Sequence, residues 1–351
     1  MNLVTINAKY YGGVDLHKNT MYVCIMERTG KIYLHKNLPC NLEAFVSAVK
    51  PFLPDLAIGV ESVYCYYWLA DACREIGIPF YLGHALYMKA IHGGKKKNDR
   101  LDSKTIANLM RSNHFPLAYP YPKEMRATRD LLRRRHYFVR ERAACYSHIQ
   151  TVFGQHAILD VGEKQVKSKT GRRELIQRFA DPDLQLSIQV DLDLIDALDR
   201  IIKPLELQIK HRAAIHDHKA YNILIATPGI GEILALSVLY EIHNINRFPT
   251  VQDFCSYARL IKCQRTSVGK NTGGGNQNIG NPYLKWAFNE IILHAQRYSP
   301  PINTYYQRLQ SKHGTRRAKS LIAHKFGIAI YFMLKNGQAF DVKRFVQNNM
   351  R

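Results

Sequence analysis

The sequence predicts an α/β domain at the N-terminus, two long helices in the middle and a mainly α-helical C-terminal part. Three patterns favour this fold class. Strand-length apolar runs alternate with helical segments up to about residue 120, apolar residues recur every three or four positions over 123–153, and an a/d seam runs through 195–209. We therefore expect three parts, at residues 1–120, 121–220 and 221–351.

The N-terminal part begins with two or three predicted strands, YYGGVDL, TMYVCIM and KIYLH, between residues 10 and 35. Asn41 is then expected to cap a helix that runs to about Val49. Further strands are expected at 56–62 and 79–84, with a helix between them. This order predicts a sheet that starts with a hairpin and continues through helical crossovers.

The middle part contains two predicted helices, at 123–153 and at about 190–217, joined by a polar segment over 154–185. Pro204 interrupts the second helix and is expected to kink it. The pair suggests an antiparallel helical hairpin. Its seam could pack within the chain or against a second subunit, and the sequence leaves both open.

The C-terminal part opens with the turn TPGIG at 227–231, followed by an apolar helix. Glycines before a helix expose backbone N–H groups that suit a phosphate, as in half of a helix–hairpin–helix motif. A simple N-terminal cap is the alternative. A Gly/Asn-rich loop is expected from 264 to Asn281, which with Pro282 begins another helix. A break at Pro300–Pro301 precedes further basic helices, the last ending near Gly337.

The composition points to a polyanion as partner. The 351 residues include 50 Lys and Arg against 28 Asp and Glu, a net charge of +22, and the 46% of hydrophobic residues excludes a disordered tail. No run of about 18 apolar residues predicts a membrane span. The seven cysteines form no CxxC pair and the N-terminus lacks a signal-peptide pattern, which favours a reducing cytoplasm. Nucleic acid is the simplest polyanion there.

The charge is also segregated along the chain. Residues 251–351 carry 16 basic and 3 acidic side chains, whereas 181–200 contain six Asp and one Arg. Any single run of charge is most simply a solvated face. The whole pattern, with two basic regions around an acidic middle, favours an extended nucleic-acid surface.

Four carboxylates are candidates for phosphoryl-transfer chemistry. Asp15 and Glu61 end two predicted strands, and Asp99 and Asp102 lie three residues apart on one face of a predicted helix start. Together they could hold two Mg²⁺ ions about 3.5–4 Å apart. Taken singly, each has a simpler explanation, as a strand-end acid or as an acid that complements a helix dipole. The basic run beside the pair, suited to phosphate contacts, is Lys95, Lys96 and Lys97.

These motifs resemble the DEDD transposases of bacterial insertion sequences, a group that includes pilin-gene invertases. The similarity rests on GVDLHK, GVES and KNDRLDSKTIA, and it continues through TPGIGEILALSVLYEI, RTSVGK and GNPYLKWAF, so that it covers most of the chain. The resemblance implies an RNase H-like (RuvC-like) N-terminal domain that binds Mg²⁺ through Asp15, Glu61, Asp99 and Asp102, and a coiled-coil-like linker before the C-terminal transposase domain.

The resemblance further implies a serine nucleophile, for which Ser267 in RTSVGK is the matching position. A serine in a Gly-rich loop can approach a phosphodiester closely, and Arg265 and Lys270 could stabilise the developing charge. Val268 stands where many relatives have glycine, so the loop departs there from the family pattern. An ordinary loop serine is the alternative.

The function implied is that of a transposase or site-specific DNA recombinase, acting as a homodimer or homotetramer, guided by an element-encoded non-coding RNA and located in the bacterial cytoplasm at the nucleoid. Two alternatives stay open: a RuvC-like junction nuclease that uses water, and a non-catalytic nucleic-acid-binding protein. The residues expected to contact nucleic acid are Lys95, Lys96, Lys97, Arg133, Arg134, Arg135, Gly229, Gly231, Arg265 and Lys270.

Overall fold

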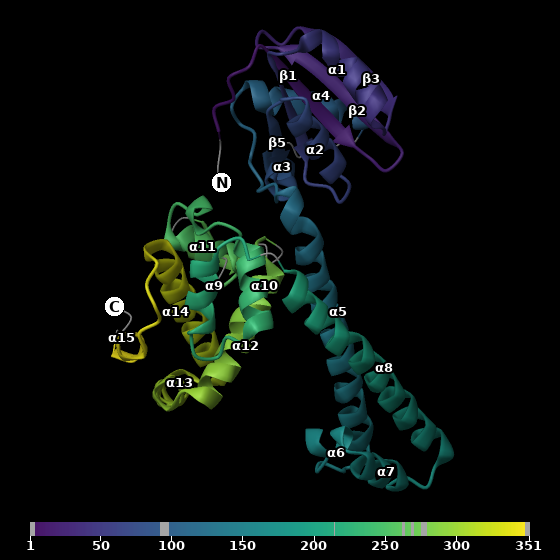
Figure 1. Ribbon diagram of the computed structural model, residues 1–351, viewed down its shortest axis with the longest axis vertical. Coiled ribbons are helices and arrows are strands. Elements are labelled where there is room, and N and C mark those ends of the chain that lie inside the picture. Colours follow the sequence, from purple (N-terminus) through teal and green to yellow (C-terminus); the bar gives the residue numbers. More distant parts are fainter. Residues whose placement is uncertain are drawn as a thin grey trace. The chain divides into compact units, whose positions relative to one another are not determined.

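The computed structural model describes residues 4–91, 98–213, 215–261, 264–267, 270–274 and 279–347 (Figure 1). The side chains at 89–91, 163, 264–267 and 270–274 lie outside this description. The chain divides into two compact units, Met1–Glu124 and Met125–Arg351. No helix in the described ranges is long and apolar enough to cross a membrane.

The N-terminal unit is built on a five-stranded mixed sheet in the order β3-β2-β1-β4-β5. The hairpin strands pair antiparallel, whereas β4 lies parallel to both β1 and β5. The predicted hairpin-led sheet with helical crossovers is therefore confirmed. The strands are β1 (Tyr10–Leu16), β2 (Thr20–Glu27), β3 (Ile32–Pro39), β4 (Leu56–Glu61) and β5 (Phe80–Gly83).

Helices cover both faces of this sheet. Asn41 caps the first of them as predicted, since its side-chain oxygen accepts a hydrogen bond from the Ala44 N–H at 2.8 Å. The apolar residues of α1 and α2 pack with the β-strand residues of one face, and those of α4 pack on the other. The helices are α1 (Leu42–Val49), a 3₁₀ turn (Lys50–Phe52), α2 (Tyr67–Glu75), α3 (Ala85–Ile91) and α4 (Asp99–Arg111).

The helix α4 lies directly on the backbone of β1. A Cβ atom at Gly13 would lie 2.2 Å from the carbonyl oxygen of Ser103 and 2.4 Å from the backbone nitrogen of Ala107. On the next strand, a Cβ at Gly59 would lie 2.3 Å from the sulfur of Met110. Because the atoms over Gly13 belong to the backbone of α4, only glycine leaves room there, and this position sets the distance between the helix and the sheet. The atom over Gly59 belongs to a flexible side chain, which can move.

The second unit begins with a hairpin of two long helices, α5 (Lys123–Gln155) and α8 (Pro182–Arg212). The predicted start of the second helix near residue 190 is wrong. Asp181 caps α8 by accepting hydrogen bonds from the N–H groups of Asp183 and Leu184, and Pro182 occupies the first turn. The connection contains two short helices, α6 (Glu163–Lys167) and α7 (Lys169–Gln177), and α8 runs on through Pro204.

The rest of this unit is a helical assembly around one apolar core. The cap at Asn281 and the break before Pro300 are confirmed. Two predictions are wrong: part of the expected loop forms an antiparallel strand pair, and a further helix follows Gly337. The elements are α9 (His218–Ile225), α10 (Glu232–Ile242), a 3₁₀ turn (Ile245–Arg247), α11 (Val251–Tyr257), β6 (Gln264–Ser267), β7 (Lys270–Gly274), α12 (Pro282–Tyr298), α13 (Pro300–His313), α14 (Thr315–Asn336) and α15 (Val342–Gln347).

A buried carboxylate joins three of these helices. Glu241 on α10 is 4% exposed, and it accepts hydrogen bonds from Arg133 at 2.6 Å and from Arg129 at 3.1 Å, both on α5. Asn281, the cap of α12, donates to the same carboxylate at 2.7 Å. Burial alone would raise the pKa of Glu241, but the arginines and the Asn281 amide outweigh it and hold this pKa below its ordinary value.

We expect Glu241→Gln to lower the free energy of unfolding at pH 7 by about 3–5 kcal/mol, because it leaves two arginines without their buried partner. Since the pKa of Glu241 is lowered by folding, its contribution is complete above its ordinary pKa of 4.5 and is lost as the pH falls through the lowered value. Urea unfolding of the full chain at neutral and acid pH measures this.

The matched control is Glu232→Gln on the same helix, because Glu232 forms an exposed ion pair with Lys210. This variant should lose less than about 1 kcal/mol. Equal losses for the two variants at pH 7, or a loss for Glu241→Gln that does not shrink in acid, would contradict the role given to Glu241.

Candidate metal centre

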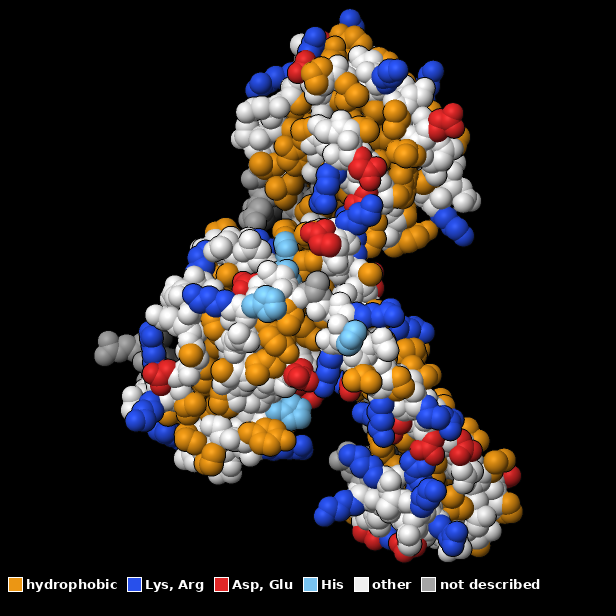
Figure 2. All heavy atoms as spheres, in the orientation of Figure 1, with side chains coloured by type: hydrophobic (Ala, Val, Ile, Leu, Met, Phe, Trp, Pro, Cys, Tyr) orange, Lys and Arg blue, Asp and Glu red, His pale blue; other side chains and the backbone are white. Residues whose placement is uncertain are grey.

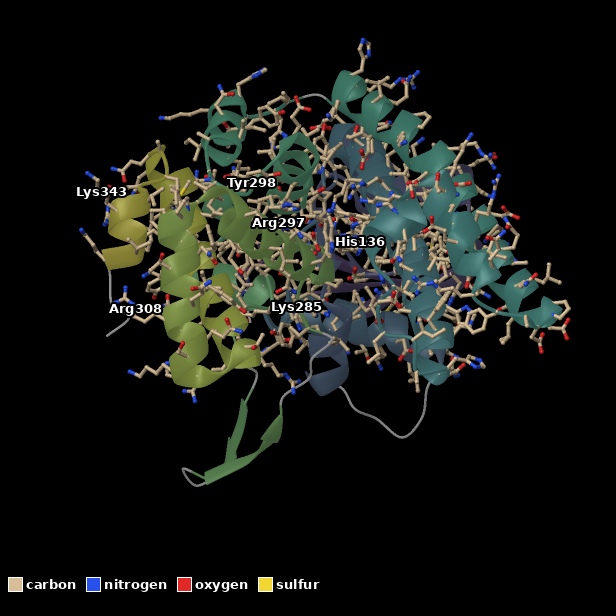
Figure 3. All side chains as sticks on the ribbon, turned by 90° about the horizontal axis from the view of Figure 1, so that it is seen from below. His136, Lys285, Arg297, Tyr298, Arg308 and Lys343 are labelled. Carbon is tan, nitrogen blue, oxygen red and sulfur yellow. The ribbon has the colours of Figure 1, made fainter. Side chains whose placement is uncertain are left out.

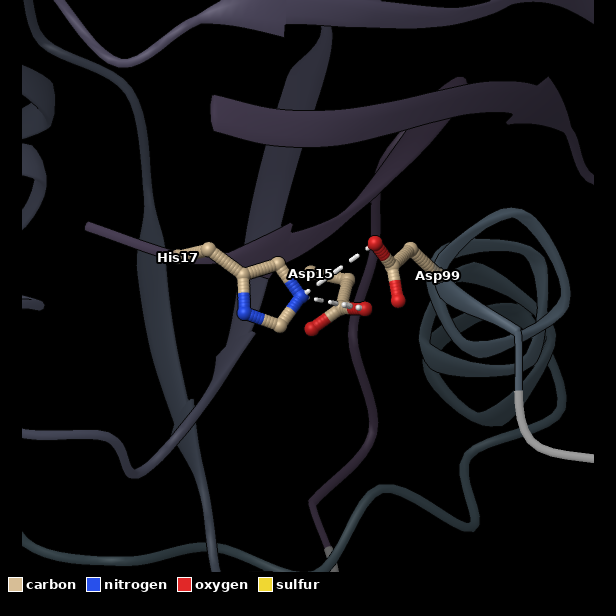
Figure 4. A group of neighbouring side chains, drawn as sticks. All are labelled: Asp15, His17 and Asp99. Atoms are coloured by element: carbon tan, nitrogen blue, oxygen red, sulfur yellow. Dashed lines mark hydrogen bonds and ion pairs between the residues drawn. The ribbon is translucent and has the colours of Figure 1, made fainter. Parts of the chain in front are cut away.

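Two acidic residues and a histidine converge where the first strand ends. Asp15 lies near the end of β1, His17 lies just beyond it, and Asp99 lies in the first turn of α4 (Figure 4). The Nε2 atom of His17 lies 3.3 Å from Asp15 Oδ2 and 3.6 Å from Asp99 Oδ2. One ligand atom from each residue lies within 4.8 Å of the others.

The local sequence explains this convergence. Because Gly13 and Asp15 are two residues apart in one strand, both face α4. Asn98 caps that helix by accepting a hydrogen bond from the Arg100 N–H at 3.0 Å, which fixes the helix start at Asp99. The close contact over Gly13 therefore brings the first turn of α4 to the end of β1.

The electrostatics of the cluster favour a bound cation. The Asp15 side chain is 12% exposed, and this burial raises its pKa. His17 acts in the opposite direction, while the charges of Asp99 and Asp102 raise the pKa further. A divalent cation would relieve this repulsion, and carboxylate oxygens with one imidazole form a donor set that such cations accept. The residues present therefore fit a divalent metal ion.

The two other predicted carboxylates lie close by. In the parallel pairing of β1 and β4, Val14 lies beside Val60, so Asp15 and Glu61 follow at the same edge of the sheet. Glu61 shares its face of the sheet with Gly59, which contacts α4. Asp102 is near enough for its charge to raise the pKa of Asp15. Within the part of the chain that the structure describes, the group that meets the 4.8 Å criterion contains neither Glu61 nor Asp102.

His17 is the residue of this cluster that the sequence analysis did not select. It stands two positions after Asp15 in GVDLHK, and alternate residues of a strand point to the same side. This two-residue spacing is the feature of the sequence that could have indicated His17 as a neighbour of Asp15. Without the fold, however, it does not distinguish a residue at the cluster from an exposed histidine after a strand.

Several predicted site residues fall outside what the structure describes. Lys95, Lys96 and Lys97 lie outside the described residues altogether. Ser267 ends β6 and Lys270 begins β7, where their backbones pair, but the side chains of Ser267, Arg265 and Lys270 are outside the description. Their roles stay predictions.

The three consecutive arginines of α5 have partners within their own unit. Arg133 binds Glu241, Arg135 pairs with Glu206 of α8, and the Arg134 guanidinium lies over the rings of Tyr137 and Phe138. The structure thus gives Arg133 and Arg135 a part in helix packing. Contact with nucleic acid stays a prediction for all three.

The two glycines of the TPGIG turn serve different purposes. Gly229 has a φ of +90°, and a Cβ there would lie 2.5 Å from the backbone nitrogen of Ala295, so it allows close packing on α12. Gly231 is the N-cap of α10, and no atom lies within 4 Å of a Cβ built there. The first glycine is thus explained by packing alone, whereas the second leaves the helix start accessible.

The turn lines a groove of about 830 Å³ in the second unit. Its lining combines basic side chains, Arg135, Arg142 and Lys210, with the acids Glu206, Glu232 and Glu290. Arg135 pairs with Glu206, and Lys210 pairs with Glu232. Tyr298, at the end of α12, also lines the groove and is 75% exposed; it is labelled in Figure 3. A helix N-terminus, cations and an exposed aromatic ring are the groups that bind phosphates and bases.

Two family models match the sequence. The model of the IS116/IS110/IS902 transposase family matches residues 221–307, and a DEDD transposase model matches residues 12–157. The transposase for insertion sequence element IS1111A of Coxiella burnetii is 20% identical over 93% of this chain and 90% of its own length. A probable family 20 transposase of Pseudomonas aeruginosa is 22% identical over 81% of this chain and 82% of its own length.

We expect Asp15→Asn to remove stabilisation by divalent cations. For the parent protein, Mg²⁺ or Mn²⁺ at 100 times its Kd should add about 2.7 kcal/mol to the free energy of unfolding. Because the pKa of Asp15 is raised in the folded state, its charge opposes folding at neutral pH, so the variant in EDTA should be at least as stable as the parent.

Thermal unfolding with EDTA and with each cation measures both effects. Glu75→Gln on α2 is the control, because Glu75 is an exposed acid of the same unit and should leave the cation effect intact. A cation effect that survives in Asp15→Asn would place the metal elsewhere.

Proposed function

Because the chain belongs to the IS110/IS116 family of DEDD transposases, we propose that it excises and inserts its element by metal-dependent cutting and rejoining of DNA. The observation that carries this proposal is the position of Asp15 beside Asp99 at the end of β1. Carboxylates gathered at a sheet edge, inside a chain of net charge +22, suit the placing of cations against a phosphodiester.

In this proposal the N-terminal domain is RNase H-like, and Asp15, Glu61, Asp99 and Asp102 hold two Mg²⁺ ions. Bound Mg²⁺ would supply Lewis-acid stabilisation of charge on the phosphate oxygens. Asp15 gives the cluster a fixed and largely buried ligand. Asp99, whose side chain is 55% exposed, would be the ligand that a DNA strand can reach. His17 orients the Asp15 carboxylate through its Nε2 contact.

Ser267 is the proposed nucleophile. Its hydroxyl oxygen would form a bond to the phosphorus while the bond from phosphorus to the leaving strand oxygen breaks. The serine proton would pass to a base, and the departing oxygen would receive a proton. The result is a transient phosphoserine link that preserves the energy of the cleaved bond for rejoining. Arg265 and Lys270 flank Ser267 in the sequence and are proposed to stabilise the transition-state charge.

We also propose a separate role for each of the three parts of the chain. Residues 1–120 would carry the metal ions, 121–220 would position nucleic acid and subunits, and 221–351 would present Ser267. The accessible start of α10 at Gly231, in the groove beside the TPGIG turn, supports a backbone-binding surface there. Lys285 and Arg297, on α12, add further positive charge to this unit (Figure 3).

A junction nuclease that uses water is the second candidate. One observation favours it: Asp15, His17 and Asp99 all belong to the N-terminal unit. Such an enzyme would need no serine.

We expect Ser267→Ala to abolish strand exchange and the covalent protein–DNA adduct, because loss of a serine nucleophile costs on the order of 10⁶ in rate. The measurement is recombination of a plasmid that carries the element ends, with denaturing gels to detect the adduct. Thr266→Ala changes the neighbouring hydroxyl and should keep activity. Continued cleavage by Ser267→Ala would favour the nuclease, and full activity in Asp102→Asn would sink both metal-dependent candidates.

The proposed guide RNA has a separate test. We expect nucleic acid that copurifies with the chain, expressed from its complete element, to contain one discrete RNA encoded beside the gene. Sequencing of the recovered RNA measures this, with RNA from a purification of an unrelated basic protein as the control. Random cellular fragments alone would count against guidance by RNA.

A further inference from the structure

The helix α12 lines the groove beside the TPGIG turn with one side chain from each of four successive turns. These side chains stand four residues apart, and they are Trp286, Glu290, His294 and Tyr298. Three of them carry aromatic rings and one carries a carboxylate. Figure 2 shows acidic, histidine and hydrophobic side chains next to one another on the second unit, in the region where Figure 1 places α12. The contribution of α12 to the groove therefore differs from the charged side chains that α5 and α8 contribute.

Glu290 is the charged side chain of this groove that has no arginine or lysine partner among the described residues. Its charged neighbour there is His294, whose Nε2 lies 3.8 Å from Glu290 Oε2, which is too long for a hydrogen bond. The Glu290 side chain is 33% exposed, so its oxygens can accept hydrogen bonds from a ligand. The other charges of the lining are neutralised in pairs, namely Arg135 with Glu206, Lys210 with Glu232 and Arg142 with Asp199.

The aromatic rings stand one turn before this carboxylate and one and two turns after it. The ring of Trp286 packs on the ring of the buried His136 of α5, with 4.3 Å between the centroids, and this contact holds it in place. The rings of His294 and Tyr298 are nearly parallel, with 6.4 Å between their centroids and 19° between their planes. Since Tyr298 is 75% exposed, its ring offers a face on which a nucleic-acid base can stack (Figure 3).

A carboxylate among rings distinguishes the bases by their hydrogen-bond donors. On the Watson–Crick edge of guanine, the N1–H and the N2 amino group point the same way, so both can donate to the two oxygens of one carboxylate. Cytosine and adenine present one amino group beside an acceptor nitrogen on this edge, and thymine presents one N–H between two carbonyl oxygens. In these three bases an acceptor faces the carboxylate, which is unfavourable. Because pairing in a duplex covers this edge, the base that fits Glu290 is an unpaired guanine.

We propose that this groove binds an unpaired guanine of a nucleic-acid strand, with the base stacked on the rings of α12 and its Watson–Crick edge on the Glu290 carboxylate. Glu290 is then the residue that gives the site its base preference. The inference deepens the proposed function and rests on it for the nucleic-acid partner. It requires neither the metal ions nor Ser267, so that strand binding in EDTA tests it separately from the cutting and rejoining of DNA.

The first test measures base preference with the full chain in EDTA. A single strand of thymidines with one central guanine should bind at least about tenfold more tightly than strands with adenine, cytosine or thymine at that position, because a bidentate base contact discriminates by about this much. Annealing to a complementary strand should remove the preference. Equal affinity for the four strands would overturn the proposal. Competition by dGMP as strong as that of the guanine strand would indicate a site for a free nucleotide and overturn the assignment to a strand.

The second test assigns the preference to Glu290. Glu290→Gln should bring the guanine and thymine strands to nearly equal affinity, because glutamine has one acceptor oxygen and turns an N–H donor toward a base edge that donates as well. Its affinity for the all-thymine strand should not change. Glu141→Gln is the matched control, since Glu141 is exposed on α5 and does not line the groove. A preference for guanine that survives in Glu290→Gln would contradict the proposal, whereas a parent chain that binds none of the strands would contradict the proposed function as well.

The third test locates the bound base. The chain has two tryptophans, so Trp68→Phe leaves Trp286 as the fluorescent reporter in the groove, and binding of the guanine strand should quench its emission. Tyr298→Ala should weaken binding of all four strands about tenfold through loss of stacking, whereas Tyr298→Phe keeps the ring and should bind like the parent. Unchanged Trp286 emission at saturation, or full affinity in Tyr298→Ala, would place the base outside this groove and overturn the proposal.

Discussion

The close contact between α4 and the backbone of β1 is the constraint on which the candidate site depends. Gly13 permits it, because any side chain there would overlap the backbone at Ser103 and Ala107. This contact carries the first turn of α4 to the strand end, where Asp99 meets Asp15. The glycine two residues before Asp15 is therefore needed for Asp99 to reach Asp15.

In the second unit, charged side chains hold helices together. Glu241 is buried among groups from α5 and α12, so part of the arginine-rich sequence of α5 serves packing. Such a pair costs desolvation and is stabilising only when every partner is in place, which ties the orientations of three helices together. The count of 50 Lys and Arg therefore overstates the number of basic side chains available to nucleic acid. Arg142, which pairs with Asp199, and Arg135 are likewise partly neutralised.

The sequence predicted those elements correctly that an apolar run or a capping residue marks. Strand-length runs of apolar and β-prone residues predicted the strands, and Asn41 and Asn281 marked helix starts because their side chains cap the backbone. The a/d seam begins only at Ile195 and so does not mark the start of α8, which the cap at Asp181 and Pro182 sets. The β6/β7 pair lies in a Gly/Asn-rich segment and α15 has only six residues, and neither composition nor apolar periodicity predicts such short elements. Strand-end position predicted Asp15 and Glu61, but His17 and Glu241 required the three-dimensional arrangement, since neither spacing nor composition reports burial.

The proposed cutting and rejoining of DNA depends on whether Asp15 and Asp99 hold a divalent cation. Crystals of the full chain soaked in Mn²⁺ test this most directly by anomalous diffraction. The account predicts an anomalous peak in contact with carboxylate oxygens of both Asp15 and Asp99. A fully occupied Mn²⁺ site elsewhere, with no peak between these two residues, would contradict it.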